Sequence, residues 1–367
     1  MGFVGLPVSS LGRPRGRCAV SRRERKGGGC FEAEAGLLPA ATELNYAKGW
    51  KDILEVTVKR QDELRNVHMV VALLRMAKQV VRLSRKEERD VLVIDNRFKD
   101  LVDAVFDDQA NVSIRHLSDA VWACGMLLAW PGEPAFSAAL TRLGNEAAEL
   151  LPKDKSNVVW ACERLGVKDR VPPNIQSYID SLPFKTLPGV LDKMELNVLD
   201  LRKELDLKRE VIQLKDKRME ESRLTAWQHQ NGKPFLYSGK TMEPSSSFTP
   251  IIDAVATELA AILGVEFDGV LINYYEDARC GMRYHSDPDQ GLYWTRDTAV
   301  VSVGDTRLFC FRRIDDNSTR HEIWVNGGDV VFMTGDCQET YQHCVKVESE
   351  RQLAGPRISL VYKKSMS

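Results

Sequence analysis

The sequence predicts an α+β protein in which an all-α helical-repeat domain precedes a double-stranded β-helix, also called a jelly roll. Apolar residues recur at three- and four-residue steps over residues 44–166, which is the periodicity of packed helices. Within that stretch a short motif returns after a fixed interval, as it does in helical repeats. From about residue 206 the sequence changes to short β-type runs bounded by Gly, Asp and Asn, which are typical of strands.

Length and composition limit the class of protein. The 367 residues are enough for two domains that each bury a core. The net charge of −1 gives no global positive field that would draw the chain onto nucleic acid or a membrane. None of the eight cysteines forms a CxxC pair, so we expect reduced thiols rather than a zinc knuckle or a disulfide framework. No apolar run approaches the roughly 18 residues that span a bilayer, so we expect no membrane segment.

The first thirty residues are rich in arginine and poor in acids. Their basic side chains are opposed only by Glu24, and are Arg13, Arg15, Arg17, Arg22, Arg23, Arg25 and Lys26. Such a start fits an organelle transit peptide, and a disordered basic tail with a nuclear role is the alternative. We therefore assign residues 1–43 to a disordered or transit segment, and expect a plastid, a mitochondrion or the nucleus as the location.

The helical domain, assigned to residues 44–170, contains a repeat. Residues 118–124 (SDAVWAC) return as residues 156–162 (SNVVWAC), an offset of 38 residues. A fixed period of this size indicates a solenoid of helical hairpins, in which each unit packs on the next. The motif resembles octotricopeptide repeats, an RNA-binding family, and this resemblance implies possible RNA binding. Trp122 and Trp160 are nevertheless expected at equivalent core positions.

Residues 171–205 are interpreted as a linker and a helix. Four prolines near the start of this segment suggest a hinge, and spaced leucines between 196 and 205 suggest a linking helix. The second domain is assigned to residues 206–367, with one helix at Phe248–Leu263 and short strands around it. This arrangement predicts a jelly roll. The expected strands are Val211–Leu214, Val300–Val303, Leu308–Phe311, Ile323–Val325, Val330–Met333 and Ile358–Tyr362.

His285 and Asp287 form a His-x-Asp pair in this second domain. Residues i and i+2 at the end of a strand point to the same side, so the imidazole and the carboxylate can reach one ion. His343 follows 58 residues after His285, ten residues past the strand Val330–Met333. Two imidazoles and one carboxylate leave three octahedral positions open, which suits non-haem iron(II) oxygenases. The pattern therefore predicts an iron(II) site.

Arg357 opens the apolar strand Ile358–Tyr362, fourteen residues after His343. An unpaired buried guanidinium is very unfavourable, so an arginine that faces the core there needs an anion. A dicarboxylate co-substrate supplies one, because its distal carboxylate can take a bidentate pair from Arg357. Its keto and C1-carboxylate oxygens would then occupy two of the open iron positions and leave the third for O2. A structural salt bridge is the alternative.

These features occur together in one region of the chain. They are the run 271–275 (LINYY), the pair His285-x-Asp287, His343 and Arg357-x5-Lys363. Together they resemble the AlkB family of nucleic-acid dealkylating dioxygenases over about residues 211–364. Residues 223–227 (RLTAW), Tyr237-Ser and 241–244 (TMEP) look like the substrate lid of the branch that demethylates 1-methyladenine and 3-methylcytosine. The resemblance implies Fe(II), 2-oxoglutarate and O2 as cofactor and co-substrates.

The resemblance also implies roles for residues beside the co-substrate. Asn273 and Tyr275 should hydrogen-bond 2-oxoglutarate next to Arg357. Lys363 stands where the family normally has a second arginine, and is assigned with them to co-substrate binding. Lysine keeps the charge but loses the planar fork of a guanidinium, so a contact with the base stays open as well.

Three further residues are implied to contact the substrate base. Trp227 and Tyr237 are expected to line the lid and stack on the base, with His285 on the opposite face, although ordinary aromatic packing is the alternative. Asp289, two residues past Asp287, matches a carboxylate that contacts the damaged base.

The function implied is oxidative demethylation of N-alkylated bases in single-stranded DNA or RNA, in DNA repair or RNA demethylation. Succinate, CO2 and formaldehyde are the expected products. One alternative is the same chemistry on a protein side chain or a lipid. A second alternative is an RNA-binding repeat protein whose dioxygenase domain is silent.

Overall fold

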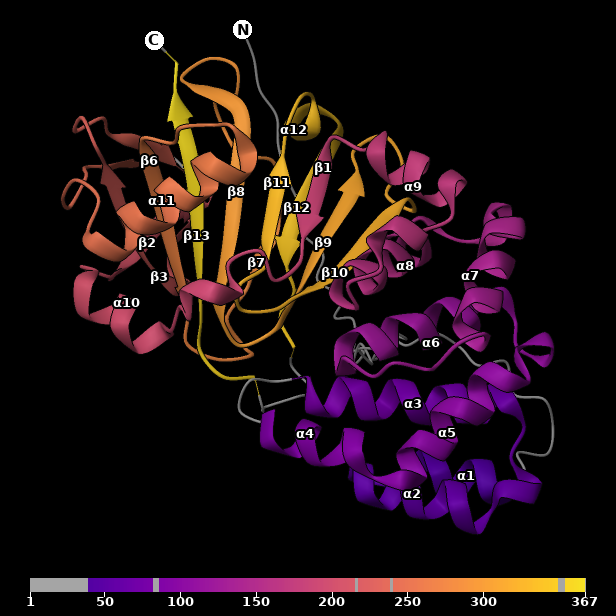
Figure 1. Cartoon of the computed structure of the whole chain (residues 1–367). Helices are drawn as coiled ribbons and strands as arrows, with labels where there is room; N and C mark the ends of the chain where they lie inside the picture. Colours follow the sequence, from indigo (N-terminus) through magenta and orange to yellow (C-terminus); the bar gives the residue numbers. More distant parts are fainter. Residues whose placement is uncertain (1–38, 82–85, 215–216, 238–239, 349–353, 367) are drawn as a thin grey trace, which may run out of the picture. The chain divides into compact units, whose positions relative to one another are not determined.

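The computed structural model describes residues 39–81, 86–214, 217–237, 240–348 and 354–366, so the basic segment 13–26 lies outside the described residues. Residues 39–367 form one compact unit. Its first half is helical (Figure 1), and the helices are α1 (Pro39–Tyr46), α2 (Trp50–Lys59), α3 (Asn66–Val80), α4 (Lys86–Ile94), α5 (Asn96–Asp107), α6 (Ile114–Leu127), α7 (Ala135–Asn145), α8 (Pro152–Arg164) and α9 (Pro173–Asp180). Helix α1 begins inside the segment predicted to be unstructured. None of the described helices is long and apolar enough to cross a membrane.

The repeated motif lies on α6 and α8, which pack against each other. Ser118 on α6 donates a hydrogen bond from Oγ to the Asp154 carbonyl at 3.3 Å. Gly125 lets the two helices approach closely, because a Cβ there would lie 2.7 Å from the Cα of Ala161. Trp122 and Trp160 are only 3% and 4% exposed, as expected for core residues. The residues of the repeated motif therefore pack the two helices together.

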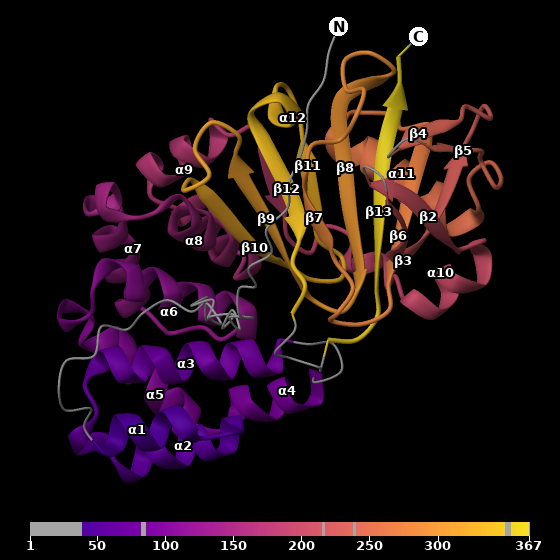
Figure 2. The same cartoon turned by 180° about the vertical axis from the view of Figure 1, so that it is seen from behind.

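In the described part of the second half, the strands form two antiparallel sheets and a hairpin, which confirms the predicted jelly-roll architecture (Figure 2). The larger sheet has the order β1-β11-β8-β13-β6-β3-β2, the smaller one β10-β9-β12-β7, and β4 pairs with β5. The strands are β1 (Phe184–Leu187), β2 (Lys208–Leu214), β3 (Lys217–His229), β4 (Phe235–Tyr237), β5 (Lys240–Met242), β6 (Gly269–Tyr275), β7 (Met282–His285), β8 (Trp294–Gly304), β9 (Arg307–Arg313), β10 (Arg320–Val325), β11 (Val330–Met333), β12 (Tyr341–Val345) and β13 (Arg357–Ser365).

Among the described residues, three α-helices accompany the strands, namely α10 (Val198–Glu204), α11 (Pro250–Leu263) and α12 (Cys337–Thr340). Helix α11 is the one predicted from residue 248, and it begins at Pro250 because proline is favoured in the first helical turn. It ends before Gly264, whose φ of 69° is the left-handed C-cap conformation. Its buried face includes Ile252, whose carbonyl accepts a 2.8 Å hydrogen bond from the Tyr362 hydroxyl, so α11 is fixed to β13 of the larger sheet.

The interpretation of residues 171–205 as a linker was wrong in one respect. Strand β1 lies within this segment and pairs antiparallel with β11, with Phe184 opposite Met333. A four-residue strand among prolines is too short to show a clear alternation of apolar and polar residues in the sequence. Its partner strand also lies far along the chain. The segment therefore forms an edge strand of the larger sheet and is not a free hinge.

The helical half and the sheets share one apolar core. Helix α8 contacts β10 and β1, the edge strands of the two sheets. Ser156 on α8 lies 2.9 Å from His321 Nδ1 on β10 (Oγ to Nδ1), and the rings of Trp122 and Trp324 are 6.5 Å apart. Edge strands have unpaired backbone groups that need to be covered, and α8 covers part of these two strands. Helix α8, which carries the second copy of the sequence motif, thus belongs to the packing of the jelly roll.

His321 gives this junction an expected pH dependence. Burial lowers the pKa of His321 to about 4, against an ordinary value of about 6.5 in the unfolded chain. The unfolded chain therefore binds the proton more tightly, and the free energy of unfolding should fall as the pH drops from 6.5 towards 4. The full loss is about 3 kcal/mol, and about 2 kcal/mol should be gone at pH 5. Urea unfolding at pH 7.5 and pH 5 measures this change in the free energy of unfolding.

The matched variant for this measurement is His321→Gln, which cannot take up the proton. Its free energy of unfolding should be lower than that of the wild type at pH 7.5, and the difference should shrink at pH 5. His116→Gln, at the start of α6, is the control and should follow the wild type. An equal pH dependence in the wild type and His321→Gln would contradict the prediction.

Candidate metal centre and co-substrate pocket

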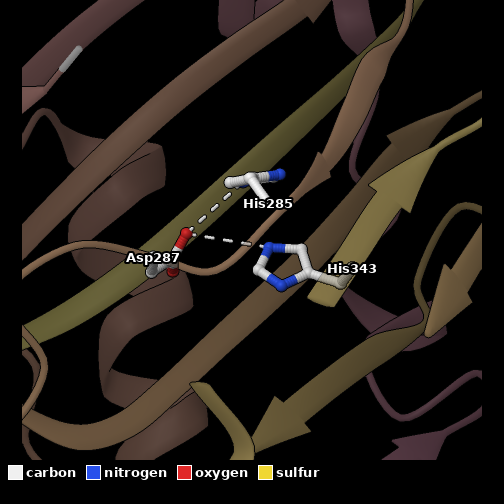
Figure 3. A group of neighbouring side chains, drawn as sticks. All are labelled: His285, Asp287 and His343. Carbon is white, nitrogen blue, oxygen red and sulfur yellow. Dashed lines mark ion pairs between the residues drawn. The ribbon is translucent and has the colours of Figure 1, made fainter. Parts of the chain in front are cut away.

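Strand pairing brings the predicted metal ligands together. β7 and β12 are antiparallel neighbours, and His285 lies directly opposite His343 in their register. Asp287 follows two residues beyond the end of β7 and turns back towards both imidazoles (Figure 3). One ligand atom from each of the three residues lies within 4.8 Å of the others. Two neighbouring strands and one short loop are thus enough to build the cluster.

The imidazoles present the same ring nitrogen to the carboxylate. Oδ1 of Asp287 lies 3.6 Å from His285 Nε2 and 3.7 Å from His343 Nε2, which is too long for hydrogen bonds. Nδ1 of His285 lies 2.9 Å from the Arg283 carbonyl oxygen, which can only accept. Nδ1 therefore carries the proton and Nε2 offers its lone pair, as in metal-bound histidines. The donor set fits a ferrous ion held between these atoms.

The charges of the three groups also suit a divalent cation. Burial acts to raise the pKa of Asp287, but the Lys363 ammonium and the two imidazoles outweigh it and hold that pKa well below its usual value. Burial, together with the nearby His285, lowers the pKa of His343 to about 3. At neutral pH the carboxylate is ionised and the His343 ring is neutral, which are the states that bind metal.

Contacts around the cluster hold its loop in place. The backbone N–H of Asp287 donates to Oε1 of Gln338 at 2.8 Å, and Ser286 Oγ donates to the Tyr341 carbonyl at 3.1 Å. The ring of Phe309 on β9 stacks on His343, with the ring centroids 5.6 Å apart and 6° between the planes. Such supporting contacts orient metal ligands before the metal binds.

A pocket begins at the cluster and runs between the sheets. Its wall includes the three candidate ligands, Phe235 from β4, and Asn273, Tyr275 and Ser359 from the larger sheet. The sequence did not single out Phe235 or Ser359, although Phe235 stands two residues before Tyr237 and could have been found from strand alternation. The pocket is mainly apolar with a few polar groups, as small-molecule sites are.

Arg357 is a buried cation with unfilled donors. It is 0% exposed, and its Nη2 donates to Ser302 Oγ at 2.8 Å. Its Nε and Nη1 find no hydrogen-bond partner among the described residues. Burial lowers its pKa to about 10, partly offset by Tyr275, whose ring centroid lies 5.4 Å from the guanidinium carbon, so the group stays charged at neutral pH. Two unused donors on a buried guanidinium form a receptor for a carboxylate.

Asn273 is fixed beside this receptor by a second arginine. It is 1% exposed, and its Oδ1 accepts from Arg223 Nε at 2.7 Å. Arg223 in turn pairs with Glu221 at 3.2 Å. Because the amide oxygen is engaged, the NH2 of Asn273 is the end that can donate to an anion in the pocket. Arg223, expected in the lid, therefore lies on β3 and supports Asn273 on the neighbouring strand β6.

Lys363 makes a different contact from the co-substrate contact that we expected. It is 1% exposed, and its Nζ lies 2.7 Å from Oδ2 of Asp287. Asp287 thus turns Oδ1 towards the imidazoles and Oδ2 towards Lys363. The ammonium neutralises and orients the candidate metal carboxylate, and in this structure it does so without the fork of an arginine.

The structure contradicts the expected role of Trp227 in base stacking. Trp227 is 1% exposed, stacks on Phe235 at 4.8 Å, meets Trp294 edge-on at 5.4 Å and donates from Nε1 to the Lys233 carbonyl at 2.8 Å. With its faces packed and its N–H satisfied, it is a core residue behind the pocket wall. The packing alternative therefore holds for Trp227.

The other two predicted substrate residues remain predictions. The backbone of Tyr237 ends β4, but its side chain lies outside the described part of the structure. Asp289 has a left-handed φ of 60°, and its carbonyl accepts from the backbone N–H groups of Leu292, Tyr293 and Trp294. The loop after Asp287 is therefore well defined, but nothing in its contacts assigns the Asp289 carboxylate to a base.

Comparisons with known proteins agree with this geometry. A sequence model described as the 2OG-Fe(II) oxygenase superfamily matches residues 186–363. The uncharacterized protein R406 of Acanthamoeba polyphaga mimivirus is 33% identical over 189 residues, 50% of this chain and 95% of that protein. Alpha-ketoglutarate-dependent dioxygenase alkB homolog 3 of Bos taurus is 28% identical over 186 residues, 48% of this chain and 64% of the relative.

A third relative is DNA oxidative demethylase ALKBH2 of Bos taurus, which is 27% identical over 140 residues, 36% of this chain and 49% of the relative. The chain therefore spans less than two thirds of the length of these two mammalian relatives. The matched superfamily model does not include the helices α1 to α9, which precede residue 186.

Proposed function

Because this chain belongs to the 2OG-Fe(II) oxygenase superfamily, we propose that it oxidatively demethylates N-alkylated bases of the 1-methyladenine and 3-methylcytosine type in single-stranded DNA or RNA. Members of this superfamily are oxidoreductases that use Fe(II), 2-oxoglutarate and O2. The similarity to an AlkB homolog and to a DNA oxidative demethylase supports nucleic acid as the substrate class. The products would be succinate, CO2, formaldehyde and the repaired base.

The observation that carries the proposal is that two incomplete sites are linked through Tyr275, which lines the pocket at the metal cluster and whose ring centroid lies 5.4 Å from the Arg357 guanidinium carbon. His285, Asp287 and His343 offer three donors to one ion, and Arg357 keeps two unused guanidinium donors. Iron(II) and a dicarboxylate would complete the two sites, and neither site is explained by packing. When bound, the iron supplies O2 activation coupled to decarboxylation of 2-oxoglutarate.

The protein residues would set the geometry of this reaction. The triad would hold iron(II), and Arg357 would grip the distal carboxylate of 2-oxoglutarate while Asn273 donates beside it. The apolar walls that include Phe235 would exclude water from the pocket. Single strands present a base without the free energy of flipping it out of a duplex, which favours them as substrates.

The test is formaldehyde release by the full-length protein with iron(II) and 2-oxoglutarate, on methylated single-stranded DNA, duplex DNA and RNA. We expect release from a single-stranded substrate, and loss of at least about 10³-fold of the rate in His343→Ala, because the third ligand is gone. His116→Ala, outside the pocket, is the control and should keep the wild-type rate. Full turnover by His343→Ala would overturn the ligand assignment.

The alternatives give different results in the same assay. An oxygenase for a protein side chain or a lipid would form succinate at a rate that methylated oligonucleotides do not change. A silent dioxygenase domain would release no formaldehyde and form no succinate with any of the substrates. RNA binding by the helical repeats remains a separate prediction, and salt-sensitive binding of single-stranded RNA by the full chain would test it.

A further inference from the structure

Cys310 and Cys344 are paired across two strands, next to the candidate metal centre. Cys310 lies on β9 and Cys344 on β12, directly opposite each other in the antiparallel register. Residues directly opposite each other in an antiparallel pair point to the same face of the sheet, so the two side chains are neighbours on one face. The two residues are 0% and 4% exposed. The function proposed above makes no use of either thiol.

The spacing of the Cα atoms in this pair fits a disulfide. The backbone N–H of Lys346 donates to the Leu308 carbonyl at 3.0 Å, so Cys344 and Cys310, two residues along each strand, form a hydrogen-bonded pair of the ladder. The Cα atoms of such a pair are about 5.5 Å apart. Disulfides join Cα atoms about 4.4 to 6.8 Å apart, with the most common value near 5.5 Å.

The two thiols point away from the metal pocket. Side chains alternate along a strand, and Phe309 and Phe311 on β9 face His343, with ring centroids 5.6 and 6.1 Å from it. Cys310 lies between them on the other face, as Cys344 does beside His343. The pair is therefore on the outer face of the smaller sheet, whose strands β9, β12 and β7 lie side by side in Figure 2.

Movable polar side chains surround the pair on this outer face. Glu322, opposite Cys310 on β10, and Lys346 form an ion pair at 3.4 Å, and their side chains are 33% and 37% exposed. Arg312 lies over the ring of Tyr284, 4.0 Å from its centroid. Partly exposed ion pairs of this kind contribute little stability, so these side chains can move aside and admit a small oxidant.

We propose that Cys310 and Cys344 are an oxidation site. A peroxide oxidises the two thiols reversibly to a cross-strand disulfide, and this bond weakens the binding of iron(II) by His343. One sulfur attacks the peroxide O–O bond and becomes a sulfenic acid, with release of one water. The second sulfur displaces that hydroxyl as a second water and forms the S–S bond. The two thiols lose two electrons and two protons, and hydrogen peroxide takes up both to become two waters.

The effect on His343 follows from the geometry of the bridge. Opposite Cβ atoms in a sheet lie about 4.5 to 5.5 Å apart, and they are less close in hydrogen-bonded pairs. A disulfide requires about 3.5 to 4.5 Å. Bridging therefore pulls β12 towards β9 at Cys344, and His343 is the adjacent residue. The register of β12 with β7 already shifts between His343 and Val345, so this stretch of β12 is irregularly paired.

The experiment starts with the full-length protein, free of metal, treated with hydrogen peroxide. Peroxide is then removed, remaining thiols are alkylated and the digest is examined by mass spectrometry for a peptide linking Cys310 to Cys344. Iron(II) affinity is measured before oxidation, after it and after reduction with a phosphine. We expect the linked peptide, and a fall of roughly tenfold in iron(II) affinity that the phosphine reverses.

Three variants make the result specific. Cys310→Ser and Cys344→Ser should give no linked peptide and no phosphine-reversible change in affinity, whereas Cys124→Ala, in the helical half, should behave as the wild type. Absence of the linked peptide in the wild type would overturn the proposal. A linked peptide with unchanged iron(II) affinity would refute the effect on His343. Because no nucleic acid is present, failure here is separate from failure of the substrate assignment.

Discussion

Replacing Arg357 by methionine should weaken 2-oxoglutarate binding by about 3 kcal/mol, roughly 150-fold, without lowering the stability of the free protein. The loss is large because a bidentate, charge-assisted pair would be removed. Stability should stay the same or rise, because the free protein would no longer bury a charged group with two unfilled donors. Calorimetric titration with 2-oxoglutarate and the melting temperature of the free protein measure the two effects.

Arg307 provides the matched control, because it is also a buried arginine of the same jelly roll. Its guanidinium donates to the backbone carbonyls of Asp277, Cys280 and Lys346. Arg307→Met leaves these oxygens without that donor. Each unsatisfied buried oxygen lowers the free energy of unfolding by about 1 to 3 kcal/mol. The melting temperature should therefore fall by on the order of 5 °C. A fall of the same size in Arg357→Met would mean that Arg357 is structural and not a receptor.

The contrast between these two arginines shows what the sequence could reveal. Arg357 was identified because a charged residue at the start of an apolar strand is unusual, and that signal is local. Arg307 also starts an apolar strand, so the same pattern occurs twice with different meanings. Only the structure shows which guanidinium already has carbonyl partners. Likewise, the convergence of His285, Asp287 and His343 could be expected from ligand chemistry and spacing, because the triad needs only two adjacent strands.

Features that depend on distant partners could not be predicted. The sequence places Trp227 in a lid-like motif, but an indole that stacks on a base and one that packs in a core look the same until Phe235 and Trp294 are located. Strand β1 is too short to show a period, and it is a strand only because β11 lies beside it. The role of α8 against β10 was hidden for the same reason, since the repeat predicts packing between helices and not packing on a sheet.

The contact between Lys363 and Asp287 leads to the second large effect. Lys363→Met keeps most of the volume of the side chain but removes the charge that lies 2.7 Å from Oδ2. We expect iron(II) affinity to fall about 10- to 100-fold, as it does when a group that orients a metal ligand is lost. The carboxylate would also lose the partner that keeps it ionised in a buried place, so the loss should be greater at pH 6 than at pH 8.

Lys363→Arg separates the charge from the shape of the side chain. If the positive charge alone orients Asp287, this variant should bind iron(II) within about threefold of the wild type, which is under 1 kcal/mol. The larger guanidinium must still fit a site that is 1% exposed, so its melting temperature is measured alongside. 2-Oxoglutarate titrations of metal-loaded protein then decide between two roles. A change confined to iron(II) affinity supports orientation of Asp287. Weaker binding of 2-oxoglutarate by Lys363→Met at saturating iron(II) would support the co-substrate role predicted from the sequence.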